Sequence, residues 1–204
     1  MATGALARQI SMKRFELMVA ELEAVALALF EQRGFDITVE EVAREAQISV
    51  RTFYRYFPTK EDVLQVRIDR RTARLREVLF ARPVDEPPLQ SLRVALEEVV
   101  AAEDLELLRR WTTVVAATPR VLPGVVGGIQ LKGHRAIAEF LGARLGVPSD
   151  ALVPTMLAAA AGGVIQAAQT HWFLRGGDLA TSIADGLAVL ESGIGAGSKM
   201  IPAG

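Results

Sequence analysis

The sequence contains no cysteine, few aromatic residues and no excess of charge of either sign. The absence of cysteine excludes disulfides, thiolate metal sites and cysteine nucleophiles, and it permits a cytoplasmic location. The 204 residues include 23 Lys and Arg against 24 Asp and Glu, which gives a net charge of −1. This balance excludes a protein that coats polyanions through a general positive charge. Any contact with nucleic acid must therefore come from a local basic patch.

Enzyme signatures are also missing. The chain has only two histidines, His134 and His171, and neither an H-E-x-x-H nor a G-x-S-x-G motif. We therefore predict that the protein is not an enzyme, and we expect no catalytic residues, no metal site and no cofactor.

One segment of the chain is uncharged over a length that could form a transmembrane helix. Residues 151–174 carry no formal charge and are long enough to span a bilayer. Much of the segment is Ala and Gly, and it contains polar side chains such as Gln166 and Thr170, which suit close helix packing better than lipid. The first twelve residues lack the apolar core of a signal peptide. We predict a buried or interface helix in a cytoplasmic protein without a membrane partner.

Apolar spacing of three and four residues runs through most of the chain and predicts an all-α fold of about nine helices. The expected helices span residues 13–32, 39–46, 50–57, 60–80, 89–102, 105–117, 122–145, 150–175 and 178–192. The first three form an N-terminal unit, residues 1–60, with very short connections. A fourth helix, 60–81, connects it to a C-terminal helical domain, 82–204.

Capping signals mark the second and third helices. Thr38 and Glu41 form a T-x-x-E capping box, and Ser49 caps the next helix. The turn between the two helices is only about three residues long. Two short helices joined by such a tight turn indicate a helix-turn-helix.

The third helix has two different faces. Phe53 and Phe57 are four residues apart and are expected to face the first two helices, which directs Arg51, Thr52, Tyr54 and Arg55 outward. No acidic residue occurs between Glu45 and Glu61, whereas Arg51, Arg55 and Lys60 are basic, so the stretch is locally +3. A basic, hydroxyl-bearing helix face suits a DNA major groove and its flanking phosphates. The alternatives are that the arginines are simply solvated and that the tyrosine rings are partly buried.

Three strings of this region resemble the N-terminal DNA-binding domain of the TetR (tetracycline-repressor) family of bacterial regulators. They are Phe30–Phe35, Thr38–Ala43 and Arg51–Leu64, within the first third of the chain. The resemblance implies that Thr38 contacts a phosphate from the second helix. It also implies base-edge positions for Val50, Arg51 and Thr52, and DNA-backbone positions for Tyr54, Tyr56 and Lys60. The predicted DNA-binding set is Thr38, Ser49, Val50, Arg51, Thr52, Tyr54, Arg55, Tyr56 and Lys60. Gln47 departs from the family pattern, which usually has glycine there, and this predicts a slightly strained turn.

The same resemblance implies a ligand-responsive regulator, most simply a repressor that leaves its operator when a small hydrophobic molecule binds the C-terminal domain. The last two helices would form a homodimer, and a two-fold dimer implies a near-palindromic operator in double-stranded DNA. Polar and aromatic candidates for effector contact are Trp111, His134, Gln166, Gln169 and Trp172. For each, a core or interface role is the alternative.

Arginines at helical spacing mark the fourth helix, at positions Arg67, Arg70, Arg71 and Arg74. They are consistent with further DNA contact, a membrane-facing surface or a salt-bridged face. The acidic residues downstream favour the last interpretation. Two other functions stay open: a helical protein that binds a small molecule without sequence-specific DNA binding, and an enzyme.

Overall fold

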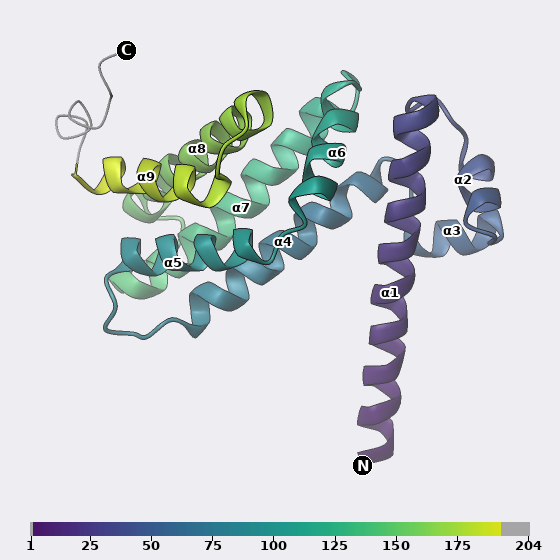
Figure 1. Cartoon of the computed structure of the whole chain (residues 1–204). Helices are drawn as coiled ribbons and strands as arrows, with labels where there is room; N and C mark the ends of the chain where they lie inside the picture. Colours follow the sequence, from purple (N-terminus) through teal and green to yellow (C-terminus); the bar gives the residue numbers. More distant parts are fainter. Residues whose placement is uncertain (1, 193–204) are drawn as a thin grey trace. The chain divides into compact units, whose positions relative to one another are not determined.

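The computed structural model describes residues 2–192, with side chains from residue 9 onward, and in this range it contains nine α-helices and no strand (Figure 1). The helices are α1 (Ala2–Arg33), α2 (Val39–Glu45), α3 (Val50–Tyr56), α4 (Asp62–Ala81), α5 (Pro88–Ala101), α6 (Leu105–Ala116), α7 (Leu122–Leu145), α8 (Leu152–Arg175) and α9 (Leu179–Ser192). The predicted all-α fold is confirmed.

Helix α1 is the element that differs most from its prediction. It begins at Ala2 instead of residue 13, although it ends as expected at Arg33, where Gly34 takes a φ of +78°. Residues 5–12 are mostly Ala, Leu, Arg, Gln and Met, which are good helix formers, and no proline interrupts them. The helix therefore continues about three turns beyond the segment that has a clear apolar face.

The chain divides into two compact units. Unit 1 comprises residues 1–68 and 106–125, and unit 2 comprises 69–105 and 126 onward. This grouping differs from the continuous division predicted at residues 60 and 82, because most of α6 packs with the N-terminal helices. The Trp111 indole donates a hydrogen bond to the backbone oxygen of Leu64, 3.1 Å away, and Arg110 pairs with Glu31. Such long-range contacts leave no periodic signal in the sequence.

The core of unit 1 joins α1, α2 and α3. Leu22 and Phe30 of α1, Val42 of α2, and Phe53 and Phe57 at α3 are all buried. Helices α2 and α3 have seven residues each and are too short to be stable alone, so they depend on packing these side chains against α1. This packing orients α3 by its inner face and leaves its other face to the solvent.

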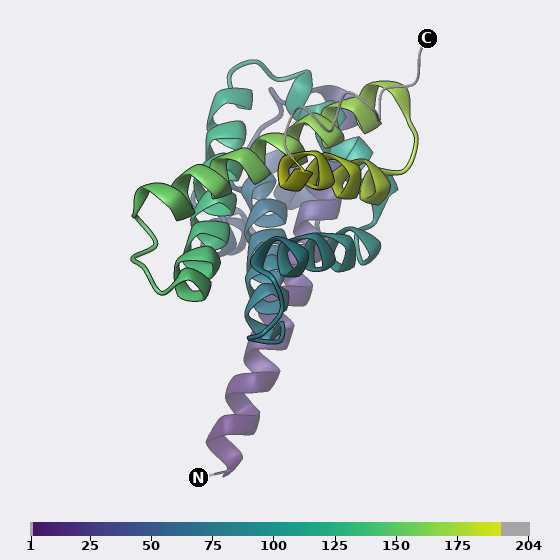
Figure 2. The same cartoon turned by 90° about the vertical axis from the view of Figure 1, so that its left-hand side faces the viewer.

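In unit 2, α9 lies between α8 and α5 (Figures 1 and 2). At Gly186 the helices α8 and α9 approach so closely that an added Cβ would lie 2.5 Å from a methyl carbon of Val164. Arg74 of α4 forms an ion pair with Glu98 of α5 at 2.6 Å, so the salt-bridged face predicted for the arginine stripe is confirmed at this position.

A small network of hydrogen bonds links the two ends of the connector between α4 and α5. Glu86 accepts hydrogen bonds from Arg82 Nε at 2.8 Å and from the Ser91 hydroxyl at 2.6 Å. The Arg82 guanidinium, and then the Ser91 hydroxyl, lower the pKa of Glu86 to about 2. The carboxylate is therefore ionised, and the network formed, throughout the neutral range.

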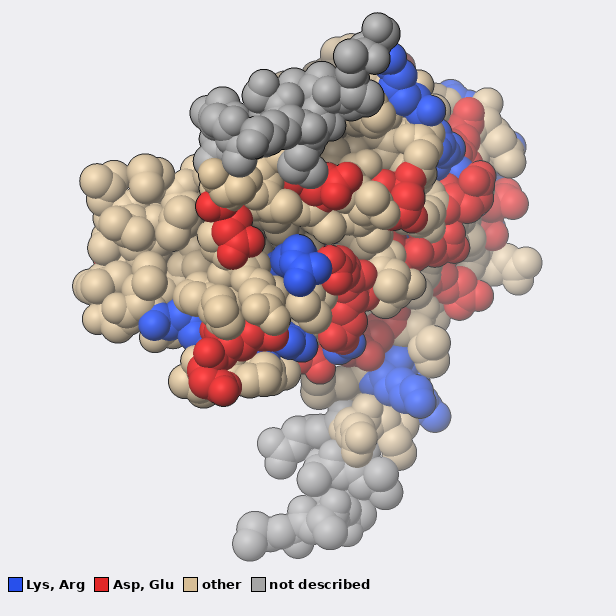
Figure 3. Space-filling view, turned by 60° about the vertical axis from the view of Figure 1, so that its left-hand side comes forward, with Lys and Arg blue, Asp and Glu red and all other residues tan. Residues whose placement is uncertain are grey.

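Helix α8 is the one helix among the described residues that is long and apolar enough to cross a membrane by length and composition. Less than a quarter of its apolar stretch is buried within the chain. Twelve positions of the helix are exposed, and seven of them form a stripe at helical spacing: Leu152, Met156, Ala159, Gly163, Ala167, Thr170 and Leu174. Figure 3 shows an area of uncharged surface at the left of the view.

Candidate DNA-binding interface

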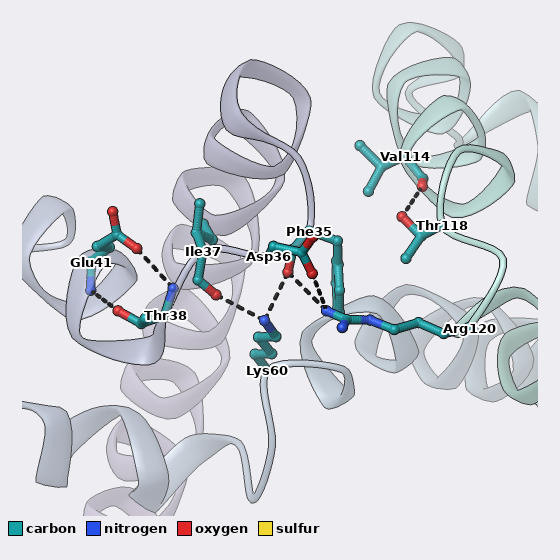
Figure 4. A network of polar contacts seen from close by, with 9 residues as sticks. All are labelled: Phe35, Asp36, Ile37, Thr38, Glu41, Lys60, Val114, Thr118 and Arg120. Atoms are coloured by element: carbon teal, nitrogen blue, oxygen red, sulfur yellow. Dashed lines mark hydrogen bonds and ion pairs between the residues drawn. The ribbon is translucent and has the colours of Figure 1, made fainter.

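Helix α2 begins with the predicted capping box. The Thr38 backbone N–H donates to Glu41 Oε2 at 2.8 Å, and the Glu41 N–H donates to Thr38 Oγ1 at 3.3 Å (Figure 4). The backbone hydrogen bond from Thr38 lowers the pKa of the Glu41 carboxyl below its ordinary value. The box fixes the start of α2 and holds the exposed Thr38 hydroxyl at that end of the helix.

The turn between α2 and α3 contains the backbone strain that the sequence predicted. Gln47 has a φ of +54° and is the only non-glycine residue with positive φ in the part of the chain that the structure describes. For an L-residue with a Cβ this conformation costs roughly 1–2 kcal/mol. The turn keeps it because the flanking helices are fixed by the core of unit 1.

Replacing Gln47 by Gly is therefore expected to stabilise unit 1 by about 0.5–1 kcal/mol, because the relief of strain exceeds the extra entropy of glycine in the unfolded chain. Urea unfolding followed by the fluorescence of Trp111, in a Trp172→Phe background, measures this unit. Gln47→Ala is the matched control and should give no gain, since it keeps the Cβ. A lower stability for the glycine variant would contradict the strain argument.

Helix α3 divides into the two faces that the sequence predicted. Ser49 caps it by accepting a hydrogen bond from the Thr52 N–H at 3.1 Å, and the two hydroxyls are 2.8 Å apart. Phe53 is fully buried, whereas the side chain of Tyr54 is 50% exposed. The inner face therefore anchors the helix, and the outer face stays accessible.

The outer face of α3 contains a shallow basic hollow. Arg51, Thr52 and Arg55 line a space of about 260 Å³, and both arginines are exposed. Val50, at the first turn, is half-buried. Guanidinium groups that surround a hollow on an accessible helix can bind phosphate or the acceptor atoms of guanine.

The two tyrosines of α3 have different surroundings. The ring of Tyr54 lies edge-on to Phe53, and Tyr54 stays half-exposed. Tyr56 is half-buried: its hydroxyl accepts a hydrogen bond from Arg55 Nη2 at 3.1 Å, and its ring lies 5.1 Å from that of Phe15 in α1. Tyr56 therefore links the end of α3 to the N-terminal part of α1.

Lys60 follows α3 and reaches back to the loop between α1 and α2. Its ammonium donates to the backbone oxygens of Phe35 and Ile37 at 2.7 and 2.8 Å (Figure 4). Arg120, in the turn before α7, approaches the same loop and pairs with Asp36 at 3.0 Å. Both cations also lie over the Phe35 ring. Two of the three ammonium protons of Lys60 are thus used within the protein, and its contact with DNA stays a prediction.

Sequence reasoning missed Phe15, Phe35 and Arg120 as parts of this region. Phe35 occurs in a string that carries the family resemblance. No pattern of neighbouring residues, however, indicates that Lys60 and Arg120 lie over its ring. Arg120 is 85 positions from the residue whose carbonyl it contacts. Only tertiary packing brings these groups to the α1–α2 loop.

The five predicted effector contacts do not all lie in one unit. Trp111 belongs to unit 1, where its indole binds Leu64, and the other four belong to unit 2. His134 packs on Gly162, and Gln166 bonds to Gln130 at 3.3 Å. The remaining two are Gln169, whose amide oxygen can accept from Arg71 at 2.9 Å, and the buried Trp172. Their role in ligand binding stays a prediction.

These observations define the class of the protein. It is a helix-turn-helix protein in which α3, the second helix of the motif, has an exposed basic face, and the rest of the chain is helical. Comparison with known proteins agrees. The model for bacterial regulatory proteins of the tetR family matches residues 23–66, and the model for the MftR C-terminal domain matches residues 86–195, which is more than half of the chain.

Two curated relatives are transcriptional regulators of similar length. TcmR of Streptomyces glaucescens is 29% identical, and the match covers 74% of this chain and 70% of TcmR. The mycofactocin biosynthesis regulator MftR of Mycobacterium tuberculosis is 28% identical, and the match covers 85% of this chain and 87% of MftR. Among solved structures, a TetR-family regulator from Syntrophomonas wolfei has a TM-score of 0.66 at 17% identity, covering 88% of this chain and 97% of its own. FadR of Thermus thermophilus, solved with lauroyl-CoA, has a TM-score of 0.57 at 24% identity, covering 86% and 94%.

The chain belongs to the TetR family, and it is a DNA-binding transcriptional regulator. Regulators of this family bind DNA operators, dimerise and bind small-molecule effectors. The relatives are regulators and not enzymes.

Proposed function

We propose that α3 lies in the major groove of a near-palindromic operator and that Arg51 reads bases there. The observation that carries this proposal is the division of α3 between a fully buried Phe53 and an exposed Arg51, with the basic hollow on the exposed side. An arginine in that position can donate two hydrogen bonds to guanine. Val50 can offer only apolar contact to a thymine methyl group, and Thr52 a hydroxyl. Repression is the regulatory outcome we propose.

The contacts to the DNA backbone are proposed to come from both sides of α3. Thr38 presents a hydroxyl at the start of α2, and Tyr54 is half-exposed beside the hollow. Ser49, Arg55, Tyr56 and Lys60 complete the set. Such contacts determine position and affinity and carry no sequence information.

The proposed homodimer forms through α8 and α9. The exposed stripe of α8 is apolar at both ends, at Leu152, Met156 and Leu174, and small in the middle, where Gly163 allows close approach. Its burial against a second copy would form a four-helix bundle around a two-fold axis. A soluble, cytoplasmic dimer explains this apolar surface without a membrane.

The proposed effector is a small hydrophobic molecule that binds the C-terminal domain. Residues 106–125 belong by sequence to the C-terminal family model, but they pack in unit 1. Arg120 carries this connection to the α1–α2 loop through Phe35 and Asp36. A change in the position of residues 106–125 would therefore act directly on the α1–α2 loop. Effector binding that causes such a change would release the protein from the operator.

Binding of the purified protein to duplex DNA tests this function. Four to six phosphate contacts per dimer from α3 and its neighbours would give a slope of log affinity on log salt of roughly −4 to −5. Operator fragments are obtained by sequencing the DNA that the protein retains, with and without a pool of candidate ligands. Salt-independent binding, or no retained sequence in common, would favour a small-molecule-binding protein without an operator.

A further inference from the structure

The structure contains a second basic element beside α3 that the family comparison does not cover. The match to the tetR family model begins at residue 23, yet α1 begins at Ala2. Figures 1 and 2 show the N-terminal half of α1 continuing past α2 and α3. We define the N-terminal extension as residues 2–15 of α1. With a rise of 1.5 Å per residue it is roughly 20 Å long.

The charge of the N-terminal extension is of one sign. Residues 2–15 contain Arg8, Lys13 and Arg14 and no acidic residue; the first is Glu16. The side chains of Lys13 and Arg14 are exposed. In a chain of net charge −1 this makes a second local cluster of three basic residues, equal to the cluster formed by Arg51, Arg55 and Lys60.

The N-terminal extension is also continuous with the DNA-facing helix. Phe15, at its end, lies against Tyr56, and the Tyr56 hydroxyl accepts from Arg55, which lines the basic hollow. The base of the extension is therefore packed on the same end of α3 that presents arginine to the solvent. All of these residues belong to unit 1.

We propose that the N-terminal extension of α1 is a DNA-binding arm, in which Lys13 and Arg14 contact phosphates that flank the groove occupied by α3. The inference rests on the proposed function of α3. Lys13 and Arg14 directly precede Phe15, so they lie within two residues of its contact with Tyr56, at the end of α3 that presents Arg55. The apolar side chains of Ile10, Met12 and Leu17 are exposed on the same part of α1. The alternative is therefore that this part of α1 binds a second copy of the chain.

The test compares the double variant Lys13→Ala, Arg14→Ala with the wild type on the same operator fragment. Each phosphate contact contributes about 0.9 to the salt slope. Two arm contacts in each subunit would therefore steepen the wild-type slope by about 3.6 beyond the roughly −4 to −5 expected from α3 and its neighbours, and the variant should return it to that range. Affinity for random duplex should fall in parallel, and hydroxyl-radical protection should shorten at both outer edges of the footprint. Both side chains are exposed, so circular dichroism and the unfolding midpoint should stay unchanged.

The matched control is Arg93→Ala, Arg135→Ala, which removes the same charge from unit 2. Both arginines form i,i+4 pairs on helix surfaces, with Glu97 and Glu139. This control should leave the salt slope and the footprint as in the wild type. An equal change in the control would assign the effect to net charge and overturn the proposal.

Two other results separate the possible failures. An unchanged slope and footprint in the Lys13, Arg14 variant, with a wild type that binds in a salt-dependent way, would overturn the arm alone. A wild type without salt-dependent binding would overturn both the arm and the proposed function. If the Lys13, Arg14 variant keeps its slope, and a chain lacking residues 2–12 changes its sedimentation, the extension binds a second copy instead of DNA.

Discussion

Phe53→Ala is expected to lower the free energy of unfolding of unit 1 by about 3–5 kcal/mol, the usual cost of removing a buried aromatic side chain. Phe53 is fully buried and is in ring contact with Phe57, 5.5 Å away. Because typical domains are stable by only about 5–15 kcal/mol, most of the margin of a small unit would be lost. Operator binding should fall with it, since Phe53 is the buried residue within α3 itself.

Two tryptophans allow the units to be followed separately. Trp111 lies in unit 1 and Trp172 in unit 2, and both are buried. In a Trp172→Phe background, Phe53→Ala should shift the fluorescence transition of Trp111 to lower urea. In a Trp111→Phe background, the transition of Trp172 should stay nearly in place.

Tyr54→Ala is the matched control for the loss of the phenylalanine, because it removes the neighbouring ring on the same helix. Tyr54 is half-exposed, so the cost to stability should be about 1 kcal/mol or less, although DNA binding weakens. A Phe53→Ala protein that unfolds and binds like the wild type would show that α3 is not supported by this packing.

Arg51→Ala is expected to have the largest effect on sequence discrimination. A bidentate contact from arginine to guanine contributes about 1–3 kcal/mol of discrimination. A dimer would lose two such contacts, about 2–6 kcal/mol in total, so specific affinity should fall at least about 30-fold. Binding to random duplex should fall much less, because only phosphate attraction is reduced there.

Tyr54→Phe and Lys60→Ala serve as comparison variants for Arg51→Ala. Both are expected to weaken specific and random duplex to a similar extent, since backbone contacts do not distinguish sequences. Competition binding on operators substituted one base pair at a time measures the difference. Equal losses on specific and random duplex from all three variants would remove the base-contacting role of Arg51.

Much of the fold could be predicted from the sequence because its signals are local. The capping box of Thr38 and Glu41 and the cap at Ser49 act over three residues, and the structure has both. The spacing of Phe53 and Phe57 likewise predicted which face of α3 is buried. The start of α1 could not be predicted in this way, because its first residues favour a helix by composition without an apolar face.

The candidate site could be predicted only in part. The exposed arginines and Tyr54 lie where the pattern placed them. Lys60 does not present a free ammonium, because two carbonyls about 25 residues away accept its protons. Trp111, which the sequence grouped with the effector candidates, bonds to Leu64 in unit 1, a contact that the sequence did not indicate, and its role in ligand binding stays a prediction.

The sequence by itself determined the class of protein: an all-helical chain with a basic helix-turn-helix and a helical second domain. Periodicity, caps and local charge determine these features, and each acts within a few residues along the chain. Only the tertiary structure decided that α6 packs in unit 1, that Arg120 approaches the α1–α2 loop, and that Phe15 joins α1 to α3. These contacts join residues from 40 to more than 80 positions apart, and they form only when the amphipathic faces of whole helices are packed together.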